Sequence, residues 1–321
     1  MAGRLRSLDL PGVAEFIKSE ACRKIVVLTG AGVSTGAGIP DFRSPGGMYS
    51  TLRPELITAT ERERALMRKD PIWVVMKDMF LRNQFPYMEV RRPFILGTQQ
   101  RKWKATISHW FFRFLEEEKL LIRLFTQNID GLDYHTGLSR QSVCNVHGSI
   151  GRVACEACGH EVPLDDFCKE VRMKIKDIYG LDPEAPKESS NIFCPKCSGP
   201  TLKPTTVLFG ASLPADFFEH ARELPLADLL IVAGTSLVVS PANSVVEMVA
   251  EDCPRLVVNR EPVGEDLGLR YGPAATRDVY SGARACDEVF FELIKLLGWE
   301  DKLRLIKDRL PPGNQALVKD L

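Results

Sequence analysis

A glycine-rich run between residues 30 and 43 combines residue types that could bind and activate a phosphorylated ligand. It reads Gly-Ala-Gly-Val-Ser-Thr-Gly-Ala-Gly-Ile-Pro-Asp-Phe-Arg and follows a short apolar stretch at 25–28. Glycines after a strand let backbone N–H groups approach a phosphate closely, with a helix N-terminus behind it. The spacing differs from the usual dinucleotide fingerprint, and Asp41, Phe42 and Arg43 add a carboxylate, an aromatic ring and a guanidinium. The run therefore predicts a nucleotide site at which the nucleotide itself reacts.

Two Cys-x-x-Cys pairs could hold a metal ion. They are Cys155 with Cys158 and Cys194 with Cys197, separated by 35 residues. Four thiolates can form the closed tetrahedron of a structural zinc site. The alternatives are four free cysteines or a catalytic metal, but no Asp or His within the pairs offers an open position. The separation exceeds the ~15–20 residues of the common spacing, so a large loop must leave the zinc module.

His147 is the candidate general base. It lies in Val-His-Gly, after the loop that follows a strand signal and just before the first cysteine pair. An imidazole at a junction between two domains suits proton removal near neutral pH, whereas a lone histidine elsewhere is more often structural. The histidines that lack this setting are interpreted as surface or packing residues: His109, His135, His160 and His220.

Small and polar residues follow each of four apolar runs, at 25–29, 121–126, 229–233 and 255–258. Helical patterns between the runs, at 110–119 and 242–250, predict a doubly wound α/β fold with a Rossmann-like parallel sheet. The polar clusters would then meet at the carboxyl edge of that sheet. Their side chains suit a carboxamide, ribose hydroxyls or phosphate, although Asn128 and Asp130 could instead cap the next helix. The clusters after the second, third and fourth runs are Gln127, Asn128 and Asp130, then Gly234, Thr235 and Ser236, then Asn259, Arg260 and Glu261.

Composition and length set the broad class. The 321 residues contain 42 Lys plus Arg and 42 Asp plus Glu, so the formal net charge is zero and favours neither nucleic acid nor an anionic membrane as partner. Nine cysteines in a chain of this length are typical of a reduced, intracellular protein. No apolar run approaches the ~18 residues that would span a bilayer. We expect a nuclear or cytoplasmic protein, with a mitochondrial location as the alternative.

Two stretches interrupt the alternation of strands and helices. Residues 49–105 form a helical module and 151–203 a zinc module, and together they predict a smaller second domain. The Rossmann-like domain would comprise 9–48, 106–150 and 204–300, with a closing helix at 289–297. Residues 301–321 are predicted to be a C-terminal tail that is loose beyond the Pro-Pro-Gly at 311–313.

In their order and content these motifs resemble the sirtuins, the NAD-dependent protein deacylases, over about residues 11–300. The matching segments are GAGVSTGAGIPDFRSP (30–45), TQNIDGLD (126–133), VHG (146–148), the two cysteine pairs, VLFG (207–210), AGTSL (233–237) and VNRE (258–261). The resemblance implies that NAD is consumed: the acyl oxygen of an acyl-lysine attacks C1′ of the nicotinamide ribose and displaces nicotinamide. His147 would then act as base toward the ribose hydroxyls, so that the products are free lysine and O-acyl-ADP-ribose.

The resemblance also assigns roles to particular positions. Asn128 and Asp130 would act with His147 in catalysis by holding nicotinamide and ribose, Phe42 would shield C1′, and Cys286 would lie near the adenine. A substrate peptide would lie extended between the domains, against Val207, Leu208, Phe209, Gly210 and the loop after Leu237. Motifs and resemblance together predict NAD contacts by Gly30, Ala31, Gly32, Thr35, Asp41, Phe42, Arg43, Gln127, Asn128, Asp130, Gly234, Thr235, Ser236, Asn259, Arg260, Glu261 and Cys286. One structural zinc ion would be held by Cys155, Cys158, Cys194 and Cys197.

Two positions depart from the family pattern. Ala211 stands where an acidic residue commonly follows Phe-Gly, and Thr205 where an Asp commonly follows Lys-Pro. Both could alter peptide contacts. Residues 49–105 also lack the Tyr-x-x-Arg pair of sirtuins that favour acidic acyl groups, so acetyl or apolar acyl groups are expected. The predicted function is protein-lysine deacetylation, with histones or other acetylated proteins as partners. The alternatives are mono-ADP-ribosyl transfer, removal of longer apolar acyl chains, or a non-catalytic reader of NAD and acyl-lysine.

Overall fold

The protein is built on a six-stranded parallel sheet with helices on both faces. The computed structural model describes residues 4–39, 47 and 50–321. The strand order is β3-β2-β1-β7-β8-β9, and every neighbouring pair is parallel. The strands of this sheet are β1 (Ile25–Thr29), β2 (Leu121–Thr126), β3 (Val143–Asn145), β7 (Leu229–Ala233), β8 (Arg255–Asn259) and β9 (Asp278–Gly282). The predicted Rossmann-like parallel sheet is confirmed. The edge strands β3 and β9 are not among the four strands that the sequence predicts.

The helices are short and many are single turns. The α-helices are α1 (Leu10–Lys18), α2 (Glu61–Lys69), α3 (Lys77–Arg82), α4 (Phe85–Gln99), α5 (Ile107–Glu117), α6 (Leu132–His135), α7 (Leu164–Lys174), α8 (Ala215–His220), α9 (Cys286–Leu297), α10 (Glu300–Ile306) and α11 (Pro312–Leu317). The 3₁₀ helices are η1 (Ala31–Val33), η2 (Thr35–Ala37), η3 (Pro54–Leu56), η4 (Pro71–Val75), η5 (Arg140–Ser142), η6 (Ala221–Leu226), η7 (Ala242–Glu247), η8 (Glu265–Leu267), η9 (Gly272–Ala274) and η10 (Lys307–Arg309). The helix predicted at 242–250 is thus the 3₁₀ helix η7.

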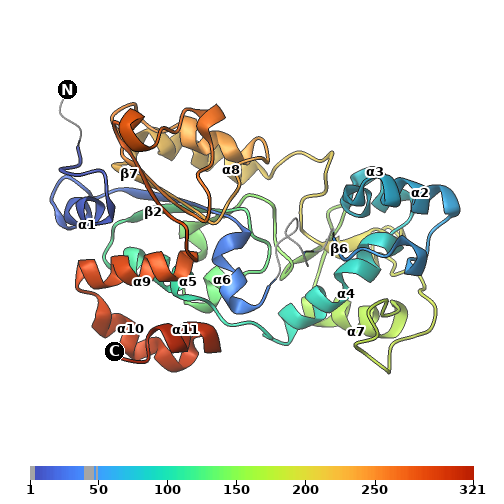
Figure 1. Ribbon diagram of the computed structural model, residues 1–321. Coiled ribbons are helices and arrows are strands. Elements are labelled where there is room, and N and C mark those ends of the chain that lie inside the picture. The colour runs from blue at the N-terminus through green and yellow to red at the C-terminus, as the bar shows by residue number, and fades with distance from the viewer. Residues whose placement is uncertain (1–3, 40–46, 48–49) are drawn as a thin grey trace.

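Alternation along β1 divides the core into two layers. Ile25 and Val27 face an apolar cluster that includes α1, α5, α9 and the C-terminal helices. Val26 and Leu28 face the opposite cluster, which is formed with α8, η6 and η7. Successive side chains of a strand point to opposite faces, so a strand buried on both sides reads as one continuous apolar run. Figure 1 shows α9, α10 and α11 on one side of the sheet and α8 on the other.

The register of the sheet brings the strand ends together. Thr29 of β1 lies opposite both Thr126 of β2 and Ala233 of β7, and Ala233 lies opposite Val258 of β8. The glycine-rich turn, the segment from Gln127 and the segment from Gly234 therefore leave the sheet at the same edge. The predicted convergence at the carboxyl edge is confirmed.

The two interrupting stretches share one apolar cluster. Ile57, Phe80 and Tyr87 from 49–105 pack in the same cluster as Val153 and Phe167 from 151–203. A three-stranded antiparallel sheet of order β5-β4-β6 carries the cysteine pairs. Its strands are β4 (Val153–Cys155), β5 (Glu161–Val162) and β6 (Leu202–Pro204). Figure 1 shows α2, α3, α4 and α7 grouped beside β6, away from the parallel sheet.

The C-terminal segment differs from the predicted loose tail. Pro312 is the first residue of α11, where a missing N–H and a fixed φ suit a helix start, so the Pro-Pro-Gly sequence begins a helix instead of ending structure. Leu303, Leu310 and Val318 are buried in the cluster that α5 and α9 share. Among the described residues, no helix is both long and apolar enough to cross a bilayer.

Candidate active site

A cavity of about 640 Å³ lies at the carboxyl edge of the sheet and extends to the smaller module. Most of the predicted nucleotide and peptide residues line it. These are Gly30, Ala31, Gly32, Thr35, Gln127, Asn128, His147, Val207, Leu208, Phe209, Gly210, Gly234, Thr235, Ser236, Asn259, Arg260 and Cys286. Asp41, Phe42 and Arg43 lie outside the described residues. One continuous space is thus bordered by the glycine-rich turn, the histidine and the peptide segment.

Close packing of two turns explains the first glycines of the run. The Gly30 N–H donates to Ala233 O at 3.0 Å, and the Gly32 N–H donates to Gly234 O at 2.8 Å. A Cβ atom on Gly32 would lie 2.6 Å from Gly234 Cα. Gly234 itself has φ of +62°, a conformation that glycine adopts at little cost. Glycine is therefore required here by the contact between the turns after β1 and β7, in addition to any approach to a phosphate.

Asn128 and Asp130 take different places at the end of β2. Asn128 lines the cavity, and its Nδ2 donates to Gly30 O at 3.0 Å and to Ser34 Oγ at 3.1 Å. Asp130 does not border the cavity among the described residues, because its carboxylate is turned inward. Its Oδ2 accepts from Ser34 Oγ at 2.7 Å and its Oδ1 accepts from the Leu132 N–H at 2.9 Å. Asp130 thus binds the first N–H of α6 from the position before its N-cap, Gly131, whereas Asn128 ties the β2 loop to the glycine-rich turn.

Ser34 and His109 belong to this network, and the sequence interpretation missed both. His109 Nδ1 accepts from the Thr106 N–H at 3.2 Å, so the ring proton is on Nε2, which lies 3.4 Å from Ser34 Oγ. His109 is fully buried and not merely a packing residue. The nearby Asp133 carboxyl has its pKa raised to about 6 by burial. A Thr-x-x-His spacing at the start of a helix was the available signal, since the imidazole replaces the usual Glu of a capping box.

His147 presents one ring nitrogen as a base. Its Nδ1 lies 3.0 Å from Gln127 O, and because a carbonyl oxygen only accepts, Nδ1 carries the proton. Nε2 therefore keeps its lone pair, as a general base requires. Burial lowers the pKa of the imidazole from its model-peptide value of 6.5, while the contact to Gln127 O opposes that shift. The ring is consequently neutral at pH 7.

The remaining nucleotide-side residues divide between the cavity wall and its surroundings. Gln127 Nε2 donates to Thr235 Oγ1 at 3.0 Å, so the ends of β2 and β7 are joined by side chains. Asn259 Nδ2 donates to Glu261 O at 3.0 Å, and the Glu261 side chain is exposed away from the described cavity wall. Burial raises the pKa of the Cys286 thiol to about 12, which leaves it a neutral lining group.

Along residues 207–210, the predicted peptide-binding segment, backbone N–H groups that are hydrogen-bonded within the described residues alternate with N–H groups that are not. The Val207 N–H donates to His147 O, on the side of the parallel sheet. The Phe209 N–H donates to Val75 O and the Phe209 C=O accepts from the Lys77 N–H, so the Phe209 backbone is bonded to the smaller module. The N–H groups of Leu208 and Gly210 have no backbone acceptor among the described residues. The structure thus narrows the predicted pairing surface at 207–210 to the edge of residues 208 and 210. Leu237 is buried in the core and does not border the described cavity.

The four cysteines fit one zinc ion. Their sulfur atoms all lie within 4.8 Å of one another, with Cys155 Sγ 3.6 Å from Cys197 Sγ and Cys158 Sγ 3.8 Å from Cys194 Sγ. A tetrahedron with Zn–S bonds of ~2.3 Å has sulfur separations of about 3.8 Å. The Cys158 N–H also donates to Cys155 Sγ at 3.4 Å, as thiolate ligands require. The donor set and its closed geometry suit a structural ion.

Comparison with known proteins agrees with this site. A model described as the Sir2 family matches residues 30–241. The chain belongs to the Sir2 family. Sir2-family relatives include NAD-dependent protein deacetylase sirtuin-3 of Mus musculus, 34% identical across 93% of this chain and 79% of that protein. Sirtuin-2 of Danio rerio is 34% identical across 93% of this chain and 74% of its own length, and hst2 of Schizosaccharomyces pombe is 33% identical across 94% and 80%. Both of these relatives are also named NAD-dependent protein deacetylases.

Proposed function

We propose that this chain is an intracellular NAD-dependent protein-lysine deacetylase whose products are lysine, nicotinamide and O-acetyl-ADP-ribose. The observation that carries the proposal is His147, which has an unprotonated Nε2 and borders the same cavity as the glycine-rich turn and the edge at Leu208. A base, a nucleotide cradle and a strand edge for a peptide in one cavity suit a reaction between NAD and an acylated peptide.

The residues would divide the work as follows. The turns after β1 and β7 would hold the phosphates, and Asn128 would hold the nicotinamide side through Oδ1, since its Nδ2 already donates to Gly30 O and Ser34 Oγ. The peptide would bind the edge at 208 and 210, which places its acyl-lysine toward His147. NAD supplies an activated ribose carbon when it is bound. His147 would then take the proton from a ribose hydroxyl, and its neutral state at pH 7 leaves it ready to do so.

The partners would be acetylated proteins, among them histones, recognised largely through the peptide backbone. The edge of residues 208 and 210 contributes main-chain N–H groups, which bind a peptide backbone without selecting its side chains. Ala211 borders the cavity next to this edge and brings no charge, so we propose no preference for basic peptides there.

The proposal is tested by whether release of nicotinamide depends on an acetyl-lysine peptide. With NAD and the acetylated peptide, nicotinamide and free lysine should appear together, whereas the unacetylated peptide should give neither. Transfer of label from NAD onto protein without loss of the acetyl group would support the mono-ADP-ribosyltransferase alternative. NAD binding with no turnover of either kind would support the reader.

Arg91 favours a second substrate class, lysines that carry an acidic acyl group, which the same assay can test. Arg91 borders the cavity, the residue is 7% exposed, and it lies four positions after Tyr87 on α4. A nearly buried guanidinium pairs well with a carboxylate. If Arg91 contacts the acyl group, succinyl-lysine should be removed at least as fast as acetyl-lysine, and Arg91→Met should reverse the order. Acyl-chain profiling with acetyl, hexanoyl and succinyl peptides measures this, and equal profiles of the two proteins would show that Arg91 does not read the acyl group.

A further inference from the structure

The C-terminal segment reaches the back of the nucleotide site through one side chain. Asn314 of α11 is 3% exposed, and it lies outside residues 30–241, which the family model matches. Its Oδ1 accepts from the Ile107 N–H at 2.7 Å, and its Nδ2 donates to Asp287 Oδ2 at 2.9 Å. Both amide atoms are therefore used on elements that belong to the predicted nucleotide-binding domain.

Asp287 completes a small buried cluster with Asn314. Its Oδ1 accepts from Ser108 N at 3.0 Å and from Ser108 Oγ at 2.5 Å. The carboxylate and the carboxamide together bind the first two N–H groups of α5, which would otherwise lack intrahelical partners. Asp287 is 5% exposed and its carboxyl group depends on these donors, because a buried polar group is costly without hydrogen bonds.

The cluster touches the glycine-rich turn at Gly36. A Cβ atom on Gly36 would lie 2.2 Å from Asp287 Oδ2 and 3.2 Å from Asn314 Nδ2, so the turn rests directly on this pair. Thr35, beside Gly36, lines the cavity, and so does Cys286, beside Asp287. Asn314 is thus separated from the cavity wall by one residue of the turn and one residue of α9.

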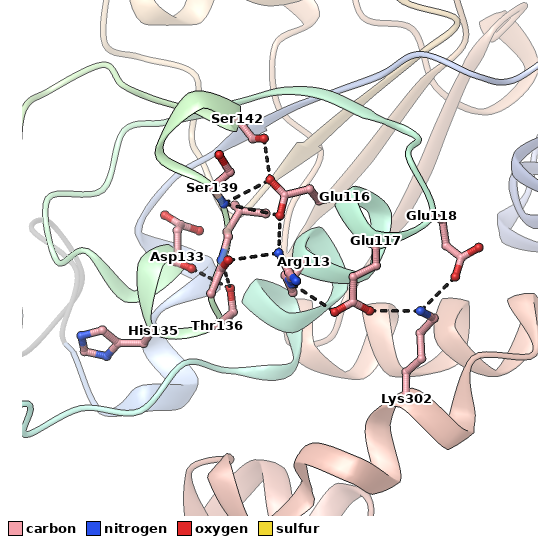
Figure 2. A network of polar contacts seen from close by, with 12 residues as sticks. Arg113, Glu116, Glu117, Glu118, Asp133, His135, Thr136, Ser139, Ser142 and Lys302 are labelled. Atoms are coloured by element: carbon pink, nitrogen blue, oxygen red, sulfur yellow. Dashed lines mark hydrogen bonds and ion pairs between the residues drawn. The ribbon is translucent and has the colours of Figure 1, made fainter.

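The C-terminal segment also contacts the other end of α5. Lys302 of α10 lies 3.0 Å from Glu117 Oε2 and 2.9 Å from Glu118 Oε1 (Figure 2). These glutamates stand at the C-terminal end of α5, whereas Asn314 binds its first N–H. In Figure 2, Arg113 and Glu116 continue this network from α5 into the loop around Ser139 and Ser142. The C-terminal segment is thus bound to α5 at both ends of the helix.

We propose that Asn314 is a positioning residue for NAD: it holds Asp287 and the start of α5 against Gly36, and so fixes the glycine-rich turn in its binding shape. This rests on the proposed function. The C-terminal segment is then part of the nucleotide site, although it does not touch the ligand.

The test compares Asn314→Ala with Gln315→Ala by titration calorimetry of the full-length protein with NAD. Gln315 is a matched control because its side-chain Nε2, as far as the described residues go, donates to Asp308 O and Leu310 O within the C-terminal segment itself. Asn314→Ala leaves Asp287 Oδ2 and the Ile107 N–H unpaired, so the Kd for NAD should rise about tenfold or more. Gln315→Ala should change the Kd by less than about twofold, and neither change should alter the KM for the acetylated peptide by more than this factor.

A second variant approaches the same contact from the other side. Gly36→Ala places a methyl group against Asp287 Oδ2 and close to Asn314 Nδ2 without changing either residue or the sequence of the C-terminal helices, and it should also raise the Kd for NAD. It decides the question if Asn314→Ala does not fold. An NAD affinity equal to wild type in Asn314→Ala or in Gly36→Ala would overturn the inference, whatever the Tm. Absence of NAD binding to the wild-type protein would instead overturn the proposed function, and the inference with it.

Discussion

Replacing His147 by alanine should lower the rate of deacetylation by about 10²–10⁴-fold, the usual contribution of a general base. In the proposed mechanism Nε2 would accept the proton, because Gln127 O holds the ring proton on Nδ1. The loss should fall on the step that follows nicotinamide release. Exchange of labelled nicotinamide into NAD should therefore persist in His147→Ala when an acetylated peptide is present, whereas O-acetyl-ADP-ribose should almost disappear.

His220→Ala is the control for this experiment. His220 lies on α8, where its ring is 3.5 Å from Glu223, and it does not border the described cavity. Its variant should keep the wild-type rate and NAD affinity. A His147→Ala protein that deacetylates like wild type would remove His147 from the mechanism.

The dependence of activity on pH should also reflect the role proposed for His147. The active form of the base is neutral, and burial holds the pKa of His147 below 6.5 in the folded protein. Activity is therefore retained as the pH falls to 6.5 and is lost only at lower pH, as the ring becomes protonated. An acid limb of kcat/KM, which reports groups of the free enzyme, with its midpoint above 6.5 would contradict this environment for His147.

Replacing Cys194 by serine should remove the zinc ion and unfold the smaller module. Cys194 is 1% exposed and lies in the apolar cluster that residues 49–105 and 151–203 share, so the ion joins the two cysteine pairs inside a core. Losing a metal cross-link costs several kcal/mol, and the Tm should fall by about 10 °C or more. Metal content by mass spectrometry and thermal unfolding measure the two effects.

Cys168→Ser provides the matched control. Cys168 is a fully buried thiol of the same apolar cluster, but its sulfur is not among the four that converge. Its variant should bind one equivalent of zinc and lose only packing energy. Equal zinc content in Cys194→Ser and wild type would contradict the assignment of the ligands.

The sequence was sufficient for the central strands and most of the cavity wall. Strands β1 and β7 are continuous apolar runs buried on both faces, followed by glycine, and this pattern predicts a parallel sheet with a ligand at its carboxyl edge. The cysteine pairs could be recognised as a metal site from their spacing alone. These features are local in the chain, so their positions follow from short stretches of sequence.

Features that depend on distant contacts could not be predicted. The Ser34 hydroxyl meets His109 and Asp130 only because the turn after β1, the start of α5 and the loop after β2 converge. The N–H and C=O groups of Phe209 are not available to a peptide, because they are hydrogen-bonded to Val75 and Lys77, more than 130 residues earlier in the chain. Pro-Pro-Gly at 311–313 marks a break in local terms, yet burial of Asn314 and Val318 orders the helix that follows.

The most direct test of the account follows the acetyl group itself. A peptide carrying ¹³C-labelled acetyl-lysine is incubated with the protein and NAD, and the products are separated by mass spectrometry. The cavity, with its nucleotide cradle, His147 and peptide edge, predicts that the label appears in O-acetyl-ADP-ribose in equal amount to nicotinamide and free lysine. Labelled free acetate formed without consumption of NAD, or consumption of NAD without movement of the label, would contradict it.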